Sequence, residues 1–90
     1  TYIANIIKAT RNEESFAIGA SPRAMLALID ASRAKALIEG RDFVKPDDVK
    51  AVAVNVLHHR LKLTGEARIK SENIDRILKS LILSVKVPMN

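Results

Sequence analysis

Cysteine and tryptophan are both absent from these 90 residues. The lack of cysteine excludes disulfide bridges, thiolate nucleophiles and cysteine-bound metals, and it fits a reducing compartment such as the cytoplasm. Aromatic residues make up only 3% of the chain, whereas hydrophobic residues make up 48%. The core must therefore be built from aliphatic side chains, which suits packed helices.

Long apolar runs are also missing, and none approaches the roughly 18 residues that a membrane-spanning helix needs. The N-terminus has no basic region and no small-residue cleavage site of a secretory signal. We therefore expect a cytoplasmic protein that does not enter a membrane. The first residues already lie inside a helical pattern, so we expect the chain to be part of a longer protein, with residues 1–90 forming one domain.

Several motifs that carry chemistry do not occur either. Neither the phosphate-binding pattern G-x-x-x-x-G-K-[ST] nor the nucleophile pattern G-x-S-x-G is found. His58 and His59 are neighbours, so on a helix they point about 100° apart and cannot readily hold one metal ion. We expect no catalytic residue and no metal ligand in this chain.

Helical periodicity dominates what is present. Residues 2–12 place Ile3, Ile6 and Ile7 on one face, and Phe16 is expected to order the loop that follows. A second helix is predicted from the Ser21-Pro22 start signal to Gly40, because serine caps a helix and proline fits its first position. Its apolar surface is wide along the sequence, so we expect this helix to be central.

A third helix is predicted after Pro46, with Asp47 and Asp48 complementing the dipole of its first turn. Lys45 supplies no helix cap, at an expected local cost of about 1 kcal/mol. A fourth helix should start after Ser71 as its cap and end near Pro88. These patterns predict an all-α, four-helix bundle, with residues 41–44 and 67–69 as a minor candidate for a short strand pair.

Arg23 is the side chain best placed for chemistry, because the hexapeptide Gly19-Ala20-Ser21-Pro22-Arg23-Ala24 delivers it into the first turn of a capped helix. Helix N-termini carry free N–H groups and partial positive charge, and a guanidinium adds donors that match phosphate oxygens. Taken alone, these residues favour a plain solvated charge. Asp30, two turns further on, is a candidate ion-pair partner.

The wider sequence resembles the C-terminal lid of MoxR-family AAA+ ATPases. The resemblance is carried by the hexapeptide, Tyr2-Ile3-Ala4, Ala9-Thr10-Arg11, the segment Gly40-Arg41-Asp42-Phe43-Val44-Lys45-Pro46-Asp47-Asp48-Val49, and His59-Arg60. It is strong to about Leu61 and depends only on pattern beyond that point. In this family the matching arginine is the sensor 2 residue, so the resemblance implies that Arg23 contacts the terminal phosphate of ATP, in its own subunit or in a neighbouring one.

The resemblance further implies that ATP and magnesium are bound by the parent ATPase and not by this fragment, which has no ATPase activity alone. The implied partners are the parent's own AAA+ core, neighbouring subunits of a hexamer, and a von Willebrand factor A domain protein in a chaperone-like machine. For His59-Arg60 we expect only a structural or inter-subunit contact.

Two other functions compete with the nucleotide-sensing lid. The net charge of +5 permits a basic helical module that binds nucleic acid, histone-like around residues 43–56. However, the lysines and arginines are scattered and there is no aromatic stacking platform, so we expect no nucleic-acid partner. The other competitor is a docking bundle that binds proteins only.

Overall fold

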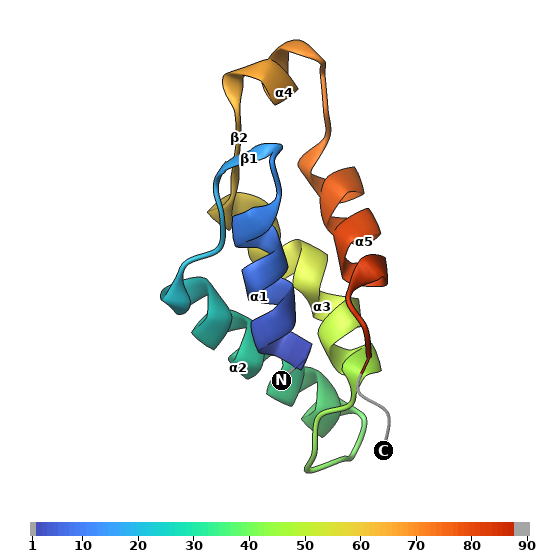
Figure 1. The fold of residues 1–90 in the computed structure, drawn as a ribbon. Helices are drawn as coiled ribbons and strands as arrows, with labels where there is room; N and C mark the ends of the chain where they lie inside the picture. Colours follow the sequence, from blue (N-terminus) through green and yellow to red (C-terminus); the bar gives the residue numbers. More distant parts are fainter. Residues whose placement is uncertain (1, 88–90) are drawn as a thin grey trace.

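A computed structural model describes residues 2–87 of the chain (Figure 1). Its elements are, in order, α1 (Tyr2–Asn12), β1 (Phe16–Ile18), α2 (Pro22–Ile38), α3 (Pro46–Leu57), the 3₁₀ turn η1 (His58–Arg60), β2 (Lys62–Leu63), α4 (Gly65–Ile69) and α5 (Ile74–Ser84). The all-α class is confirmed. The four predicted helices are α1, α2, α3 and α5, and α4 is a further short helix within the segment that the sequence suggested was a loop.

The core is aliphatic, as the composition predicted, and every long helix contributes to it. Its most deeply buried large side chains are Ile6 from α1, Leu28 from α2, Leu57 from α3 and Leu78 from α5. Phe16 of β1 is also buried in this cluster, so it packs on the core as an anchor for the segment after α1 would. One continuous core therefore ties together segments from both ends of the described chain.

The sequence predicted that α2 would be central because its apolar surface is wide, and this prediction was wrong. α2 does pack against α1 and α3, but it buries only one narrow stripe, made of Ala24, Leu28, Ser32 and Ala36. The larger side chains that made its apolar surface look wide are exposed; they are Leu26 at 62%, Leu37 at 67% and Ile38 at 82%. α2 therefore lies on the outside of the bundle and presents apolar side chains to whatever lies beyond this chain.

The candidate strand pair was also wrong. β1 pairs with β2 in antiparallel fashion, with Phe16 opposite Leu63. Residues 41–44 form a connector, and residues 67–69 lie in α4, which begins after Thr64 because the threonine hydroxyl accepts a hydrogen bond from the N–H of Ala67 at 3.1 Å. Figure 1 shows the strand pair beyond the long helices, with α4 at the far end of the molecule from the start of α1.

The cap of the last helix is two residues later than the sequence suggested. Asn73 is the N-cap of α5, and its side chain accepts from the N–H of Arg76 at 3.2 Å. Ser71 instead has a positive φ of 58° in the turn that ends α4. The predicted end of the helix near Pro88 falls outside the described residues, and α5 ends at Ser84.

Candidate functional site

Arg23 lies in the first turn of α2, which starts as the sequence predicted. Ser21 is extended, with φ −83° and ψ 168°, and its hydroxyl accepts a hydrogen bond from the N–H of Ala24 at 3.2 Å. Pro22 occupies the first helical position, where its missing N–H leaves no backbone donor unpaired. These local contacts fix the backbone on both sides of Arg23. The first turn of α2 lies at the left edge of the bundle in Figure 1.

The side chain of Arg23 is exposed. No hydrogen bond or ion pair joins its guanidinium to any residue between 2 and 87, and the candidate pair with Asp30 does not form there. A free guanidinium next to a helix N-terminus would repel other cations and attract an anion. Chemically, this arrangement is suited to bind phosphate oxygens.

The residue that leads into this turn, Ala20, is held on both sides by the last turn of α1. Its N–H donates to the hydroxyl of Thr10 at 3.0 Å, and its carbonyl accepts from Nε of Arg11 at 2.8 Å. Thr10 is fully buried, and its hydroxyl also donates to the carbonyl of Ile7 at 2.7 Å. We call Thr10, Arg11 and Ala20 the α1 clamp.

Gly19 allows the chain to come this close to α1. A Cβ atom at this position would lie 2.7 Å from the Cα and 2.9 Å from the backbone nitrogen of Arg11. Contacts this short with backbone atoms cannot be relieved by rotating a side chain. Glycine is therefore required here because of the close approach, and the hexapeptide begins with the residue that lets the α1 clamp form.

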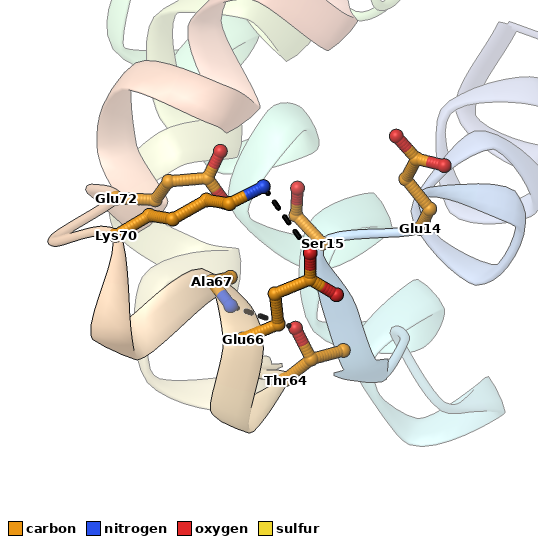
Figure 2. Close-up of a pocket in the computed structure, with 7 residues that line it drawn as sticks. All are labelled: Glu14, Ser15, Thr64, Glu66, Ala67, Lys70 and Glu72. Atoms are coloured by element: carbon orange, nitrogen blue, oxygen red, sulfur yellow. Dashed lines mark hydrogen bonds and ion pairs between the residues drawn. The ribbon is translucent and has the colours of Figure 1, made fainter.

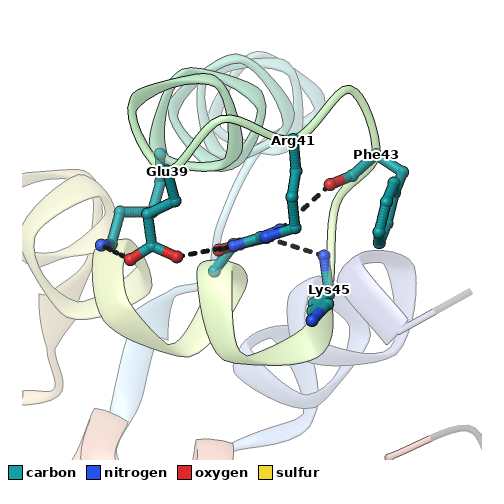
Figure 3. A network of polar contacts seen from close by, with 6 residues as sticks. Glu39, Arg41, Phe43 and Lys45 are labelled. Atoms are coloured by element: carbon teal, nitrogen blue, oxygen red, sulfur yellow. Dashed lines mark hydrogen bonds and ion pairs between the residues drawn. The ribbon is translucent and has the colours of Figure 1, made fainter.

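A second polar cluster lies at the other end of α2 and was missed by the sequence reasoning (Figure 3). Arg41 makes two hydrogen bonds to the buried carboxylate of Asp48, at 2.6 and 2.7 Å, and two more to Glu39 and to the carbonyl of Phe43. The guanidinium holds the pKa of Asp48 well below its usual value, and the N–H of Lys45 acts in the same direction. Asp48 is therefore more than a first-turn acid.

The same carboxylate compensates for the poor cap at Lys45. The side chain of Lys45 does not cap α3, but its backbone N–H donates to Oδ2 of Asp48 at 2.8 Å. This contact is the reverse half of a capping box. The pairing joins the end of α2 to the start of α3, so the cluster has a structural explanation that needs no ligand.

Polar side chains from three segments line a shallow groove of about 180 Å³ (Figure 2). Glu14 and Ser15 come from the turn before β1, Glu66 and Lys70 from α4 and the residue after it, and Glu72 from the following turn. Nζ of Lys70 lies 3.2 Å from the Glu66 carboxylate. The groove is acidic on balance, but between residues 2 and 87 no three histidines or carboxylates are grouped so that they could hold a metal ion.

The histidine pair has a partner that the sequence reasoning did not foresee. Nδ1 of His58 contacts the carboxylate of Asp75, which lies in the first turn of α5, while the ring of His59 packs edge-on against His58. Because this contact links η1 to α5, it stabilises the position of the last helix. A signal of this kind is not visible in one sequence, since the two residues are 17 positions apart.

An apolar patch is exposed where α2 leads into α3, made of Leu37, Ile38, Phe43 and Val44. We call it the α2–α3 patch. Leu37, Phe43 and Val44 of this patch line a small hollow of about 160 Å³, to which Arg33 and Asp42 add charges. An exposed apolar patch of this kind is typical of a protein–protein contact.

In the part of the chain that the structure describes, no helix is long and apolar enough to cross a membrane.

With this geometry described, comparison with known proteins identifies the family. Residues 8–81 match the family described as AAA lid domain. The chain belongs to the AAA lid domain family. The lid is 39% identical over 88 residues to the uncharacterised protein YeaC of Bacillus subtilis, and 38% identical over 96 residues to chaperone MoxR1 of Mycobacterium tuberculosis. The predicted resemblance to a MoxR-type AAA+ ATPase lid is thereby confirmed.

A solved structure supports the same conclusion for the fold of the lid. A predicted ATPase from Cytophaga hutchinsonii contains a region that superimposes on this AAA lid with a TM-score of 0.91 at 30% sequence identity, covering 98% of the lid and 29% of that protein. The lid likewise spans 28% of YeaC and 26% of MoxR1. None of these likenesses lends support to the nucleic-acid alternative.

Proposed function

We propose that this AAA lid senses bound ATP through Arg23, acting as the sensor 2 residue of a MoxR-like AAA+ ATPase. The observation that carries the proposal is the state of that side chain: it is exposed and has no partner among residues 2–87, although it lies beside a capped helix N-terminus. An unpaired cation there is better explained if a phosphate binds to it. Membership of an ATPase family supports ATP as the source of that phosphate, and the exposed guanidinium of Arg23 supports this side chain as the hydrogen-bond donor.

In this proposal residues 1–90 form one lid domain, and the remainder of a longer parent chain binds ATP and magnesium. Closure of the lid brings Arg23 against the terminal phosphate, and hydrolysis releases it. The continuous core lets the lid move as a rigid body, so loss of one phosphate contact is passed on as motion. The lid has no ATPase activity of its own.

The expected partners are other parts of the same machine. The α2–α3 patch is an apolar surface that the parent's own AAA+ core, or a neighbouring subunit of a hexamer, would cover. His59 and Arg60 are exposed at the end of η1 and are candidates for an inter-subunit contact. By family, we further propose a cytoplasmic chaperone-like assembly that works with a von Willebrand factor A domain protein.

The test is ATP turnover by the full-length parent carrying Arg23→Ala. We expect a loss of about 10³-fold, by analogy with arginines that contact a transferred phosphate. Arg76→Ala is the matched control, because Arg76 is an exposed arginine in the first turn of another capped helix, α5. Equal losses in the two variants, or no loss in either, would refute the proposal.

Mixing subunits determines whose nucleotide Arg23 contacts. Arg23→Ala subunits are combined with subunits that cannot bind ATP. Recovered turnover in the mixture would mean that Arg23 acts across the subunit boundary. No recovery would mean that it acts within its own subunit.

A further inference from the structure

We propose that Thr10 and Arg11 are positioning residues for Arg23, holding the backbone that carries its side chain at a fixed place relative to α1. The inference rests on the proposed function and extends it to the two residues that carry no phosphate contact. Both polar groups of the Ala20 backbone are bonded to α1, one to the Thr10 hydroxyl at 3.0 Å and one to Arg11 Nε at 2.8 Å.

Each residue from Ala20 to Pro22 has its backbone constrained by a different interaction. Ala20 is 1% exposed and bonded at both its N–H and its carbonyl, and Ser21 is fixed by its cap to Ala24. Pro22 has its φ set by its ring. No freely rotating residue therefore separates α1 from the helical turn that presents Arg23.

Such rigidity matters for a group that must meet a phosphate. A displacement of about 1 Å in a positioned catalytic contact can reduce turnover by about 10²-fold. In the lid, a shift of the 19–22 segment away from α1 would move the start of α2, and with it the base of the Arg23 side chain. Gly19 contributes to this rigidity, because a residue without a Cβ atom can lie against the backbone of Arg11. The α1 clamp depends on that close approach.

Variants of the two clamp residues distinguish an effect on the position of Arg23 from an effect on the local charge. Arg11 is exposed and cationic, so a variant of this residue alone changes both the hydrogen bond and the local charge. Thr10 is buried and uncharged, so Thr10→Val removes the hydroxyl at nearly constant volume and constant charge. Thr10→Ser restores the hydroxyl and serves as the conservative control.

The experiment measures ATP turnover of the full-length parent with Thr10→Val, Thr10→Ser and Arg11→Ala, each alone and combined with Arg23→Ala. We expect Thr10→Val and Arg11→Ala to lower kcat by about tenfold, with Thr10→Ser close to wild type. In the Arg23→Ala background neither clamp variant should cause a further loss, because the group that they position is gone. A purely structural role would give the same fold loss in both backgrounds, and that result would overturn the inference.

Failure of the inference and failure of the proposed function give different results. If Arg23→Ala lowers kcat and the clamp variants do not, the clamp does not position Arg23 and the proposed function stands. If Arg23→Ala leaves kcat unchanged, the proposed function is refuted, and any loss caused by the clamp variants comes from elsewhere. Hydrogen exchange provides a readout independent of turnover at two amides: that of Ala20, which donates to Thr10, and that of Met25, which donates to the carbonyl of Ser21 at 3.1 Å. Arg11→Ala should speed exchange at both, and unchanged exchange would overturn the inference.

Discussion

Arg41 and Asp48 face each other in a two-point contact, with nitrogen–oxygen distances of 2.6 and 2.7 Å, and the Asp48 side chain is only 2% exposed. Bidentate pairing of this kind uses the planar guanidinium fully, which a lysine could not do. The contact closes the turn between α2 and α3, and the same Asp48 carboxylate accepts a hydrogen bond from the backbone N–H of Lys45, the N-cap residue of α3. The contact joins the end of α2 to the start of α3.

Removal of the Arg41–Asp48 contact should lower the stability of the whole AAA lid. Arg41→Ala leaves a buried carboxylate without its cation, so we expect a clear fall in melting temperature. Lys35→Ala is the control, because Lys35 pairs with Glu39 across a far more exposed contact that contributes little. A thermal melt in which the two variants fall equally would show that burial does not strengthen the Arg41 contact.

Acid should weaken the lid through the same carboxylate. The pKa of Asp48 is lowered in the folded state, first by Arg41 and then by the backbone of Lys45, from an ordinary value of 3.8. The unfolded chain therefore takes up a proton at a higher pH than the folded chain. Stability from this group is present above about pH 4 and is lost as the pH falls further. Asp48→Asn should flatten that part of the curve of unfolding free energy against pH.

A matched pair of leucines on α2 tests the finding that this helix lies on the outside. Leu28 is completely buried, so Leu28→Ala should cost about 2–5 kcal/mol of unfolding free energy. Leu26 is 62% exposed, so Leu26→Ala should change it by less than about 0.5 kcal/mol. Urea unfolding of the 90-residue chain measures both, and a large loss for Leu26→Ala would contradict the described orientation of α2.

Two glycines provide a similar comparison. Gly19→Ala places a methyl group against the backbone of Arg11 and should destabilise the lid by about 1–3 kcal/mol. Gly65→Ala, at the start of α4, meets nothing within 4 Å and should stabilise it by about 0.4–1 kcal/mol through a stiffer unfolded chain. If Gly19→Ala proves neutral, the close approach to α1 is not as tight as described.

The hydroxyl of Tyr2 is buried and makes no hydrogen bond to the described residues. Burial raises the pKa of this phenol above its ordinary value of 10.0, and the charge of Asp47 adds to the effect. Because the folded state retains the proton longer, stability should be constant below about pH 10 and fall above it. Tyr2→Phe should reduce that alkaline fall and raise stability at neutral pH by up to about 1 kcal/mol. A loss at neutral pH would reveal a partner for the hydroxyl.

The sequence predicted those parts of the fold that depend on local signals. Ser21 and Pro22 mark the start of α2 because a cap and a ring act on their own residues, and the apolar stripe of α5 follows from helical spacing. The pairing of β1 with β2 was missed because it brings together residues about 47 positions apart in a contact only two or three residues long. The contact between His58 and Asp75 was missed for the same reason. Arg41 and Asp48 are only seven positions apart, and their pairing was missed because it depends on how the turn between α2 and α3 folds back.

The prediction for α2 failed for a different reason. Leu26, Leu37 and Ile38 count as core residues in any pattern of apolar positions, yet they are exposed in this chain. A sequence pattern records what a helix can bury but not whether the covering surface belongs to the same domain. Arg23 shows the converse, since local signals placed it correctly in a capped first turn, while the role proposed for it requires a phosphate from outside the chain.

The most direct test of the proposed role of Arg23 is the affinity of the full-length parent for ATP compared with ADP. If Arg23 contacts the terminal phosphate, Arg23→Ala should weaken ATP binding by roughly 10- to 100-fold, the loss of one charged hydrogen-bond contact, and leave ADP binding within about twofold. Equal weakening of both nucleotides, or none, would contradict the role proposed for Arg23.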